Sequence, residues 1–253
     1  MQALKLSFIL GIIWAVIGNS GNSESYANFK VGLVLDKGGK DDKSFNAAAV
    51  EGAERAKKEL GIEFKYVEAT DGASVDAILR KFAERKFDLI IGIGIAQKDG
   101  VQKIGSQFKD QKFAIVDAEV GLPNVRTLLF QEHEGSYLVG AIAALTSQSG
   151  TIGFIGGMDV PLIRRFQMGY EAGARAVRPK TKMVSNYVGV TGSAWNNPPQ
   201  AKALAISQFQ TGADVIFAAA GASNMGLFDA AEEKNKFAIG VDSNQNWIKP
   251  GHV

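Results

Sequence analysis

The chain of 253 residues is long enough for one large domain or two smaller ones, and 46% apolar with 21% charged residues is ordinary for a soluble globular protein. The net charge of +2, without any block of like charges, gives no indication of a nucleic-acid or membrane-surface partner. The sequence contains no cysteine, which excludes disulfides, thiolate catalysis and cysteine-ligated metal sites.

The first residues are typical of an export signal. Lys5 precedes an apolar run from Leu6 to Ile17, which is too short to span a bilayer comfortably. A polar stretch follows and ends in the small-x-small pattern Ser25-Tyr26-Ala27. We predict a cleaved signal peptide over residues 1–27, with an uncleaved N-terminal anchor as the alternative. An exported chain without disulfides suits the bacterial periplasm.

The next segment predicts a strand, a polar loop and a helix. The apolar run from Val31 to Leu35 predicts a buried strand, and Ser44 stands where a helix N-cap is expected. In open α/β sheets, ligands bind where loops leave the carboxyl ends of strands. The loop from 36 to 43, together with Phe45 and Asn46, is therefore a candidate ligand site.

Strand-like and helix-like patterns then alternate along the chain. Including the first strand, apolar runs predict strands at 31–35, 64–69, 88–93, 113–117, 125–130, 151–155, 183–190, 214–219 and 237–241. Helical patterns lie at 44–60, 74–86, 97–108, 135–147, 161–177, 199–211 and 224–234. Ser74 is the expected cap of the second helix. The alternation predicts an α/β protein with doubly wound parallel sheets, and a glycine-rich stretch near 150 suggests a second lobe.

The three aspartates of the first loop, Asp36, Asp41 and Asp42, offer hard oxygen ligands for a divalent cation. A metal-dependent nucleoside hydrolase would need a further aspartate at the position of Val34, so we expect no metal. A role in ligand binding is favoured for Asp36 and its neighbours, and a solvated turn beside the helix N-terminus is the alternative.

Further candidates follow later strands. Asp117 and Asp242 each end a strand, where a carboxylate can accept hydrogen bonds from a neutral ligand at about 1.5–3 kcal/mol each. Helix capping is the alternative for both. Phe45 and Trp195 lie at loops and can stack on a planar ligand, which contributes about 1–3 kcal/mol per ring. Packing on the core is the alternative for both rings.

Nothing in the sequence favours catalysis or a cofactor. The glycines at 92–94 and 153–157 lack the G-x-G-x-x-G spacing of a dinucleotide site. His133 has Glu134 and Ser136 beside it, but side chains one or two positions apart on a helix do not face each other. Neither G-x-S-x-G nor H-E-x-x-H occurs. We expect a protein that is not an enzyme and binds no cofactor.

Four segments resemble the basic membrane protein (BMP) family of ABC-transporter substrate-binding proteins, which includes purine nucleoside receptors. They are DKGGKDDKSFN at 36–46, LLFQEHEGSYLVGAIAAL at 128–145, GFIGGMDVPLIRRFQMGYEAGA at 153–174 and IGVDSNQ at 239–245. The resemblance spans the chain after the predicted signal peptide. It implies a type I periplasmic-binding-protein fold, in which two lobes joined by a hinge close over a nucleoside.

The resemblance also implies domain limits. We expect an N-terminal lobe over 28–130, a crossover with an interlobe helix over 131–150, a second lobe over 151–241, and the start of a return segment over 242–253.

Individual residues match the family's binding positions. The resemblance implies that Phe45 and Trp195 stack on the two faces of the base. It implies that Asp117 bonds the base edge and that Asp242 bonds the ribose hydroxyls. Further ligand-binding positions match Asp36, Asn46 and Gly221.

The sequence departs from the family pattern twice. Many members carry a lipid-modified cysteine after the signal, and this chain has none, so we expect it free in the periplasm. Members also continue past the segment matching residues 250–253, with a lysine that helps to bind ribose. We therefore expect a chain that is truncated at the C-terminus, either as a fragment or in a shortened gene.

The expected function is the capture of a nucleoside, with a purine favoured, for an ABC permease in the inner membrane. No nucleic-acid partner is expected, and a monomer is the default for such a receptor. The alternatives are a nucleoside sensor on the same fold, a non-functional remnant and, least favoured, a metal-dependent nucleoside hydrolase.

Overall fold

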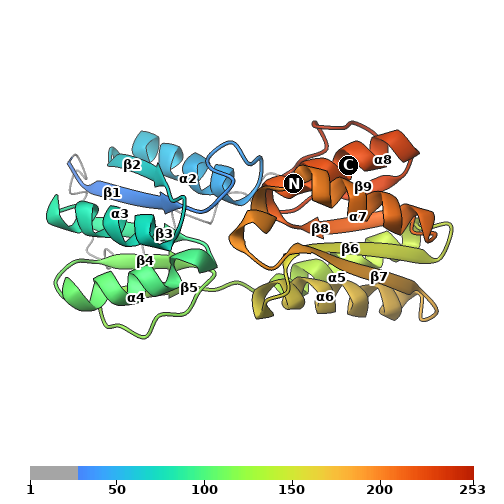
Figure 1. Ribbon diagram of the computed structural model, residues 1–253, viewed down its shortest axis with the longest axis horizontal. Coiled ribbons are helices and arrows are strands. Elements are labelled where there is room, and N and C mark those ends of the chain that lie inside the picture. The colour runs from blue at the N-terminus through green and yellow to red at the C-terminus, as the bar shows by residue number, and fades with distance from the viewer. Residues whose placement is uncertain (1–27) are drawn as a thin grey trace. The chain divides into compact units, whose positions relative to one another are not determined.

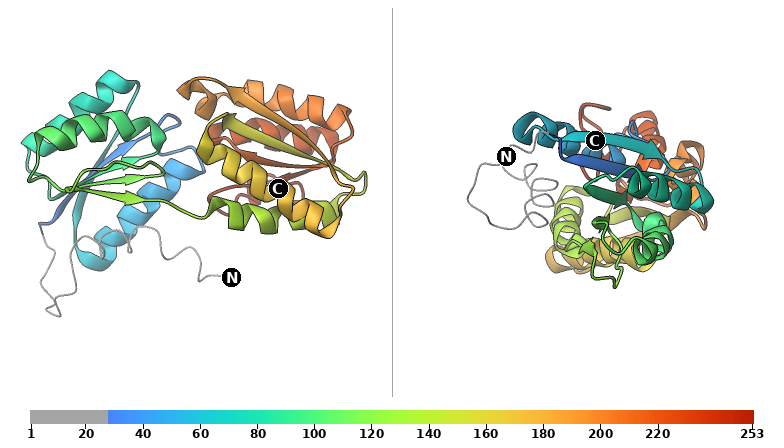
Figure 2. Two further views of the ribbon diagram at one scale, coloured as in Figure 1. Left: turned by 90° about the horizontal axis from the view of Figure 1, so that it is seen from below. Right: turned by 90° about the vertical axis from the view of Figure 1, so that its left-hand side faces the viewer.

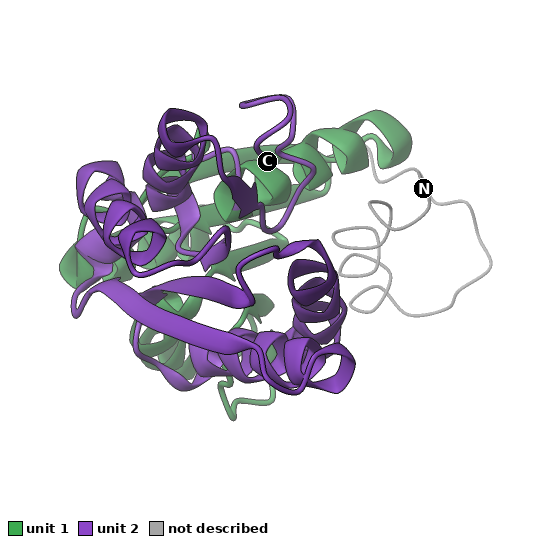
Figure 3. Ribbon diagram, turned by 90° about the vertical axis from the view of Figure 1, so that its right-hand side faces the viewer, with its two compact units in different colours: residues 1–41, 45–130 green, residues 42–44, 131–253 purple. Residues whose placement is uncertain are grey.

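The computed structural model describes residues 28–253, so the predicted signal peptide lies outside the described residues. The described chain divides into two compact units (Figure 3). The first contains residues up to 41 and residues 45–130, and the second contains residues 42–44 and 131–253. None of the helices within 28–253 is both long and apolar enough to cross a bilayer.

The first unit is a parallel sheet with helices on both faces (Figure 1). Its strands have the order β2-β1-β3-β4-β5. In chain order its elements are β1 (Lys30–Leu35), α2 (Phe45–Leu60), β2 (Glu63–Glu68), α3 (Gly72–Glu84), β3 (Leu89–Ile93), α4 (Lys98–Gln107), β4 (Phe113–Val116) and β5 (Val125–Leu128). A short 3-10 helix, η2 (Ile95–Gln97), leads into α4.

The second unit contains a four-stranded parallel sheet of order β7-β6-β8-β9. Its elements are α5 (Glu132–Thr146), β6 (Thr151–Met158), α6 (Pro161–Val177), β7 (Lys182–Gly189), α7 (Pro198–Gln210), β8 (Val215–Ala219), α8 (Asn224–Lys234) and β9 (Phe237–Ile239). The 3-10 helices η3 (Gly192–Asn196) and η4 (Gly221–Ser223) precede α7 and α8. The predicted strands and helices are confirmed, with ends that differ by a few residues.

The two units repeat one topology. The order β2-β1-β3-β4 in the first sheet corresponds to β7-β6-β8-β9 in the second. In the first unit α2 covers one face of the sheet, and α3 with α4 covers the other. In the second unit α5 and α6 cover one face, and α7 with α8 covers the other. Equivalent strand ends in the two units can therefore be compared directly.

Two helix starts illustrate the local rules. Pro161 begins α6, where its missing N–H costs no hydrogen bond. The expected cap of α3, Ser74, is instead its third residue, and Asp71 is the N-cap. Asp71 accepts a hydrogen bond from the Ser74 N–H at 2.8 Å, and the Ser74 hydroxyl accepts one from the Asp71 N–H at 3.1 Å. This reciprocal pair is a capping box, in which serine takes the place usual for glutamate.

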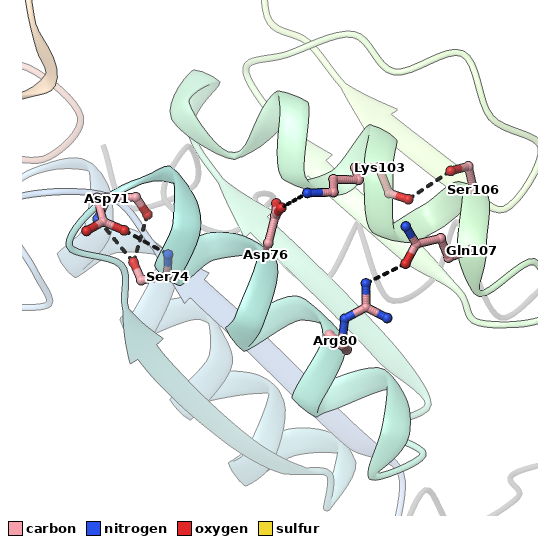
Figure 4. A network of polar contacts seen from close by, with 7 residues as sticks. All are labelled: Asp71, Ser74, Asp76, Arg80, Lys103, Ser106 and Gln107. Carbon is pink, nitrogen blue, oxygen red and sulfur yellow. Dashed lines mark hydrogen bonds and ion pairs between the residues drawn. The ribbon is translucent and has the colours of Figure 1, made fainter.

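Helices α3 and α4 pack side by side on the first sheet and share a polar network (Figure 4). Lys103 forms an ion pair with Asp76 at 2.5 Å, and Arg80 donates to the Gln107 side chain at 2.5 Å. These side chains lie at the surface, where an ion pair contributes about 0–1 kcal/mol. The apolar core beneath the two helices therefore accounts for most of their attachment.

Candidate functional site

In the first unit, predicted site residues gather at the carboxyl edge of the sheet. Asp36 directly follows β1, and its backbone N–H donates to the Asn46 side-chain oxygen at 2.9 Å. Asn46 is buried in the first turn of α2, so this bond joins the end of β1 to the start of the helix. Asp117 directly follows β4 and lies at the same edge, because parallel strands end on the same side of a sheet.

Gly94, which follows β3, brings two of these side chains together. A Cβ added at Gly94 would lie 2.8 Å from the Asp36 Oδ2 atom and 3.3 Å from the Phe45 Cε1 atom. The φ angle of Gly94 is +96°, a backbone conformation that favours glycine. The Asp36 carboxylate and the Phe45 ring therefore converge on a position that only glycine fills without strain.

Phe45 is half-buried and packs against the core cluster beneath α2. Core packing, the alternative considered from the sequence, thus accounts for part of the ring. The rest of its surface remains accessible beside Gly94 and Asp36. A ring supported from behind in this way is held in a fixed orientation, which lowers the entropy cost of stacking on a ligand.

The other aspartates of the first loop do not join this group. Asp41 forms an exposed ion pair with Lys40 at 2.7 Å, whereas Asp42 is buried and accepts the Ser44 N–H at 2.9 Å. Across residues 28–253, no three His, Asp or Glu side chains come close enough to hold a metal ion. The three carboxylates of the loop therefore have different surroundings: Asp36 lies beside Gly94, Asp41 is exposed and Asp42 is buried.

In the second unit, Trp195 is held by glycines at the carboxyl edge of the sheet. Trp195 lies in η3, directly beyond β7. A Cβ at Gly157, just before the last residue of β6, would overlap the indole ring, and one at Gly221 would lie 3.1 Å from the Trp195 carbonyl oxygen. The indole therefore rests against the backbone of β6, and Trp195 and Gly221 are neighbours.

Hydrogen bonds hold the loop that carries Trp195. The Ser223 hydroxyl donates to the Ala194 carbonyl at 2.7 Å and accepts the Asn197 N–H at 2.7 Å. Both partners flank Trp195 closely in sequence, and Ser223 is buried at the start of α8. The orientation of the indole is thus tied to the loop that follows β8.

Asp242 lies beyond β9 and is bonded by a residue far away in sequence. The Ser44 hydroxyl donates to its Oδ2 atom at 2.5 Å. The residue retains solvent exposure, but protein atoms crowd its carboxyl group. This loss of hydration, with the nearby Asp42 charge, outweighs the Ser44 bond and raises the pKa of Asp242 to about 6.

Gln245 connects the Asp242 turn to the same distant segment. Its side-chain amide donates to the Lys43 carbonyl at 2.7 Å, and its side-chain oxygen accepts the Val241 N–H at 2.9 Å. Gln245 is buried, so both bonds are shielded from water. Residues 42–44 therefore belong to the second unit by their contacts, although they precede α2 in the chain.

Asp117 and Asp242 share an unusual backbone. Their φ angles are +63° and +66°, in the left-handed region that costs a non-glycine residue about 1–2 kcal/mol. They follow β4 and β9, which occupy equivalent places in the two sheets. Backbone strain of this kind clusters at ligand sites, so the two aspartates stay candidates for ligand binding.

Asp159 is a carboxylate at the same edge of the second sheet that the sequence analysis did not single out. It directly follows β6 and accepts two hydrogen bonds from Arg164, at 2.6 and 2.9 Å. The Arg164 guanidinium holds the pKa of Asp159 below its usual value. The Asp159 carboxylate is thus already paired with Arg164, five residues later in the same unit.

The structure therefore brings together two groups of predicted residues, one in each unit. In the first unit Asp36, Phe45 and Asn46 are neighbours, with Asp117 at the same edge. In the second unit Trp195 and Gly221 are neighbours, and Asp242 follows a strand at the same edge. Two contributors were missed, Ser44 and Gln245. Both lie within segments that carry the family resemblance, and their place in those segments was the available signal.

Comparison with known proteins gives consistent matches. A family model described as Bmp, ABC transporter substrate-binding protein PnrA-like, matches residues 29–253. A CD4+ T-cell-stimulating antigen of Listeria innocua is 34% identical over 96% of this chain and 73% of its own length. An uncharacterized lipoprotein of Pyrococcus furiosus is 34% identical over 97% of this chain and 64% of its own length.

A solved structure supports the same relationship. The crystal structure of an ABC transporter solute-binding protein from Aeropyrum pernix superposes with a TM-score of 0.82 and 30% identity, covering 89% of this chain and 65% of that one. The predicted type I periplasmic-binding-protein fold is confirmed. The chain spans about two thirds to three quarters of the length of these relatives.

Proposed function

The chain belongs to the Bmp family of PnrA-like ABC transporter substrate-binding proteins, and from this premise we propose that it captures a nucleoside, favouring a purine, for an ABC permease. The family binds its ligands and does not transform them, so the chain is a binding protein and not an enzyme. Substrate-binding proteins of importers work outside the inner membrane, and we place this one in the periplasm.

The observation that carries the proposal is the pairing of one aromatic ring with strand-end carboxylates in each unit. Phe45 accompanies Asp36 and Asp117 in the first unit, and Trp195 accompanies Asp242 in the second. A nucleoside has a flat base that stacks on aromatic rings and a sugar whose hydroxyl groups donate to carboxylates. Each stacking ring contributes about 1–3 kcal/mol, and each charge-assisted hydrogen bond about 1.5–3 kcal/mol.

We assign the two rings to opposite faces of the base. Asp117 accepts a hydrogen bond from the base edge, and Asp242 accepts bonds from the ribose hydroxyls. Asn46 and Asp36 hold the loop at the end of β1, and their bond at 2.9 Å supports that role. Gly221 supports the proposal because a Cβ there would lie 3.1 Å from the Trp195 carbonyl oxygen and its φ of +60° favours glycine, so this position keeps the backbone close to Trp195.

Isothermal titration with guanosine, adenosine and inosine tests the proposal. We expect saturable binding of at least one of them, with the free base and free ribose binding at least tenfold more weakly. This result would mean that both the base and the ribose contribute to binding, as the assigned contacts require. A well-folded protein that gives no heat with any nucleoside would refute the proposal.

A further inference from the structure

Three buried side chains in the described part of the chain carry a polar atom without a hydrogen-bond partner, namely Gln97, Tyr170 and Gln208. Buried polar atoms are nearly always paired, because an unpaired one loses its hydration without compensation. Of the three residues, only Gln97 belongs to the first unit, where it lies in η2 directly beyond β3. The unpaired Gln97 oxygen is therefore at the edge of the sheet that carries the candidate ligand residues.

The first sheet makes room for this glutamine. Gln97 is fully buried, and a Cβ added at Gly92, within β3, would lie 2.9 Å from the Gln97 Cβ atom. Glycine inside a strand is unfavourable and often marks a close approach of another group. The protein thus retains two features that weaken the fold, a glycine within β3 and an unpaired buried oxygen. Departures of this kind from the usual packing rules are expected at functional sites.

The Gln97 amide contacts the peptide group that precedes Asp36. Its Nε2 atom donates to the Leu35 carbonyl at 3.4 Å, and this carbonyl also accepts the Ala69 N–H at 3.1 Å. The N–H of the same peptide group donates to the Asn46 side chain at 2.9 Å. Asn46 lies in α2, whereas Gln97 leads into α4 on the opposite face of the sheet (Figure 2). The peptide group is therefore held from both helix layers.

We propose that Gln97 is a positioning residue for Asp36, because it fixes the peptide group from which the Asp36 side chain projects. The inference rests on the proposed nucleoside function, in which Asp36 contributes to the ligand site. The Asp36 carboxylate lies against Gly94, where an added Cβ would be 2.8 Å from its Oδ2 atom. Rotation of the preceding peptide group would change the direction of this carboxylate, and the Gln97 amide opposes that rotation.

Packing alone does not account for an amide at this position. Methionine has nearly the length and volume of glutamine and adapts readily to irregular space in a core. It would fill the place of Gln97 without leaving a buried oxygen unpaired. Gln97→Met therefore separates the positioning of Asp36 from the stability of the fold.

The test measures stability, local exchange and affinity of Gln97→Met. We expect the melting temperature to rise by about 2–4 °C, because the unpaired oxygen is removed. In NMR measurements the Asp36 amide hydrogen should exchange about 2-fold to 10-fold faster, which corresponds to the loss of one hydrogen bond. The nucleoside Kd, measured by titration, should rise by a similar factor.

Gln208→Met is the matched control, because Gln208 is a buried glutamine of the second unit that also has an unpaired oxygen. Its amide donates to the Phe154 carbonyl and to the Asn186 side chain, both at 2.9 Å. Loss of these two bonds should lower the melting temperature. Exchange at Asp36 and the nucleoside Kd should stay unchanged, so a change of stability by itself does not reproduce the effect of Gln97→Met.

Each contrary result has a distinct meaning. A Gln97→Met protein that melts at a lower temperature or fails to fold would overturn the proposal in favour of a purely structural role. Unchanged exchange at Asp36 would overturn it as well, and so would an unchanged Kd when the native protein binds a nucleoside. Exchange requires no ligand, so faster exchange in Gln97→Met supports the positioning of Asp36 even if the native protein binds no nucleoside, a result that refutes the proposed function alone.

Discussion

Replacing Asp242 by asparagine should change ligand binding and stability in opposite directions. Asn keeps the size of the side chain and tolerates the φ angle of +66°, so the turn after β9 should be preserved. The change removes the negative charge that we assign to the ribose hydroxyls. Loss of a charge-assisted hydrogen bond costs about 1.5–3 kcal/mol, so we expect the nucleoside Kd to rise about 10-fold to 150-fold at pH 7.5.

The stability of the free protein should increase. The folded-state pKa of Asp242, about 6, lies above the value near 3.9 for an unfolded chain. Such a group favours the folded state fully below pH 4 and loses that contribution as pH rises through 6, because the fold disfavours its charged form. Asp242→Asn should therefore raise the melting temperature at pH 7.5 and make little difference at pH 4.5.

Isothermal titration and thermal unfolding, each at both pH values, check the two effects. Affinity of the unchanged protein should also fall as pH drops below 6, whereas the affinity of Asp242→Asn should not follow this titration. Asp41→Asn is the matched control, because it removes an exposed carboxylate paired with Lys40 and should alter neither quantity measurably. A variant that binds normally, or one that is less stable at pH 7.5, would contradict the reasoning.

Three further changes test the packing at the site and beneath it. Trp195→Ala should weaken nucleoside binding about 5-fold to 150-fold through lost stacking, measured by titration, while Trp247→Ala, at an exposed ring, should not. Gly157→Ala should weaken binding to a similar degree with the fold retained, because the added Cβ overlaps the Trp195 ring and must displace it; unchanged affinity would argue against a fixed indole. Gly173→Ala should lower the free energy of unfolding by about 3 kcal/mol or more in a denaturant titration, because its Cβ overlaps the Tyr137 carbonyl and backbone must move. Gly135→Ala, in open space on α5, should instead raise it by about 0.5–1 kcal/mol.

The sequence was most informative where local pattern decides structure. Short apolar runs predicted the five inner strands β1, β3, β4, β6 and β8, because a strand buried between two helix layers must be apolar on both faces. The edge strands were also predicted, although β2 is almost entirely exposed and carries polar residues. Asp117 and Asp242 were identified because each follows such a run directly. Their left-handed backbone was not foreseeable, since aspartate is only one of the residues that tolerate it.

Contacts between distant segments could not be predicted. The bonds from Ser44 to Asp242 and from Gln245 to Lys43 join residues about 200 positions apart, and no local pattern encodes such a pairing. The repeated topology of the two units was also invisible in the sequence, because it resides in strand order rather than in residue identity. The cap of α3 was misplaced at Ser74 because serine is favoured at the N-cap and can also complete a capping box from within the helix.

The repetition bears on why a ligand should need both units. One ring and one carboxylate, as a single unit offers them, supply roughly 2.5–6 kcal/mol. Association costs about 4 kcal/mol or more in lost translational and rotational freedom, so one unit alone would hold a nucleoside only very weakly. Doubling the contacts gives about 5–12 kcal/mol, and because the association cost of about 4 kcal/mol is incurred once, the balance of up to about 8 kcal/mol approaches a micromolar Kd at its upper end. A ligand that contacts both repeats would thus have an association constant far more than twice that for one repeat alone. Substitution of either ring should therefore remove most of the measured affinity.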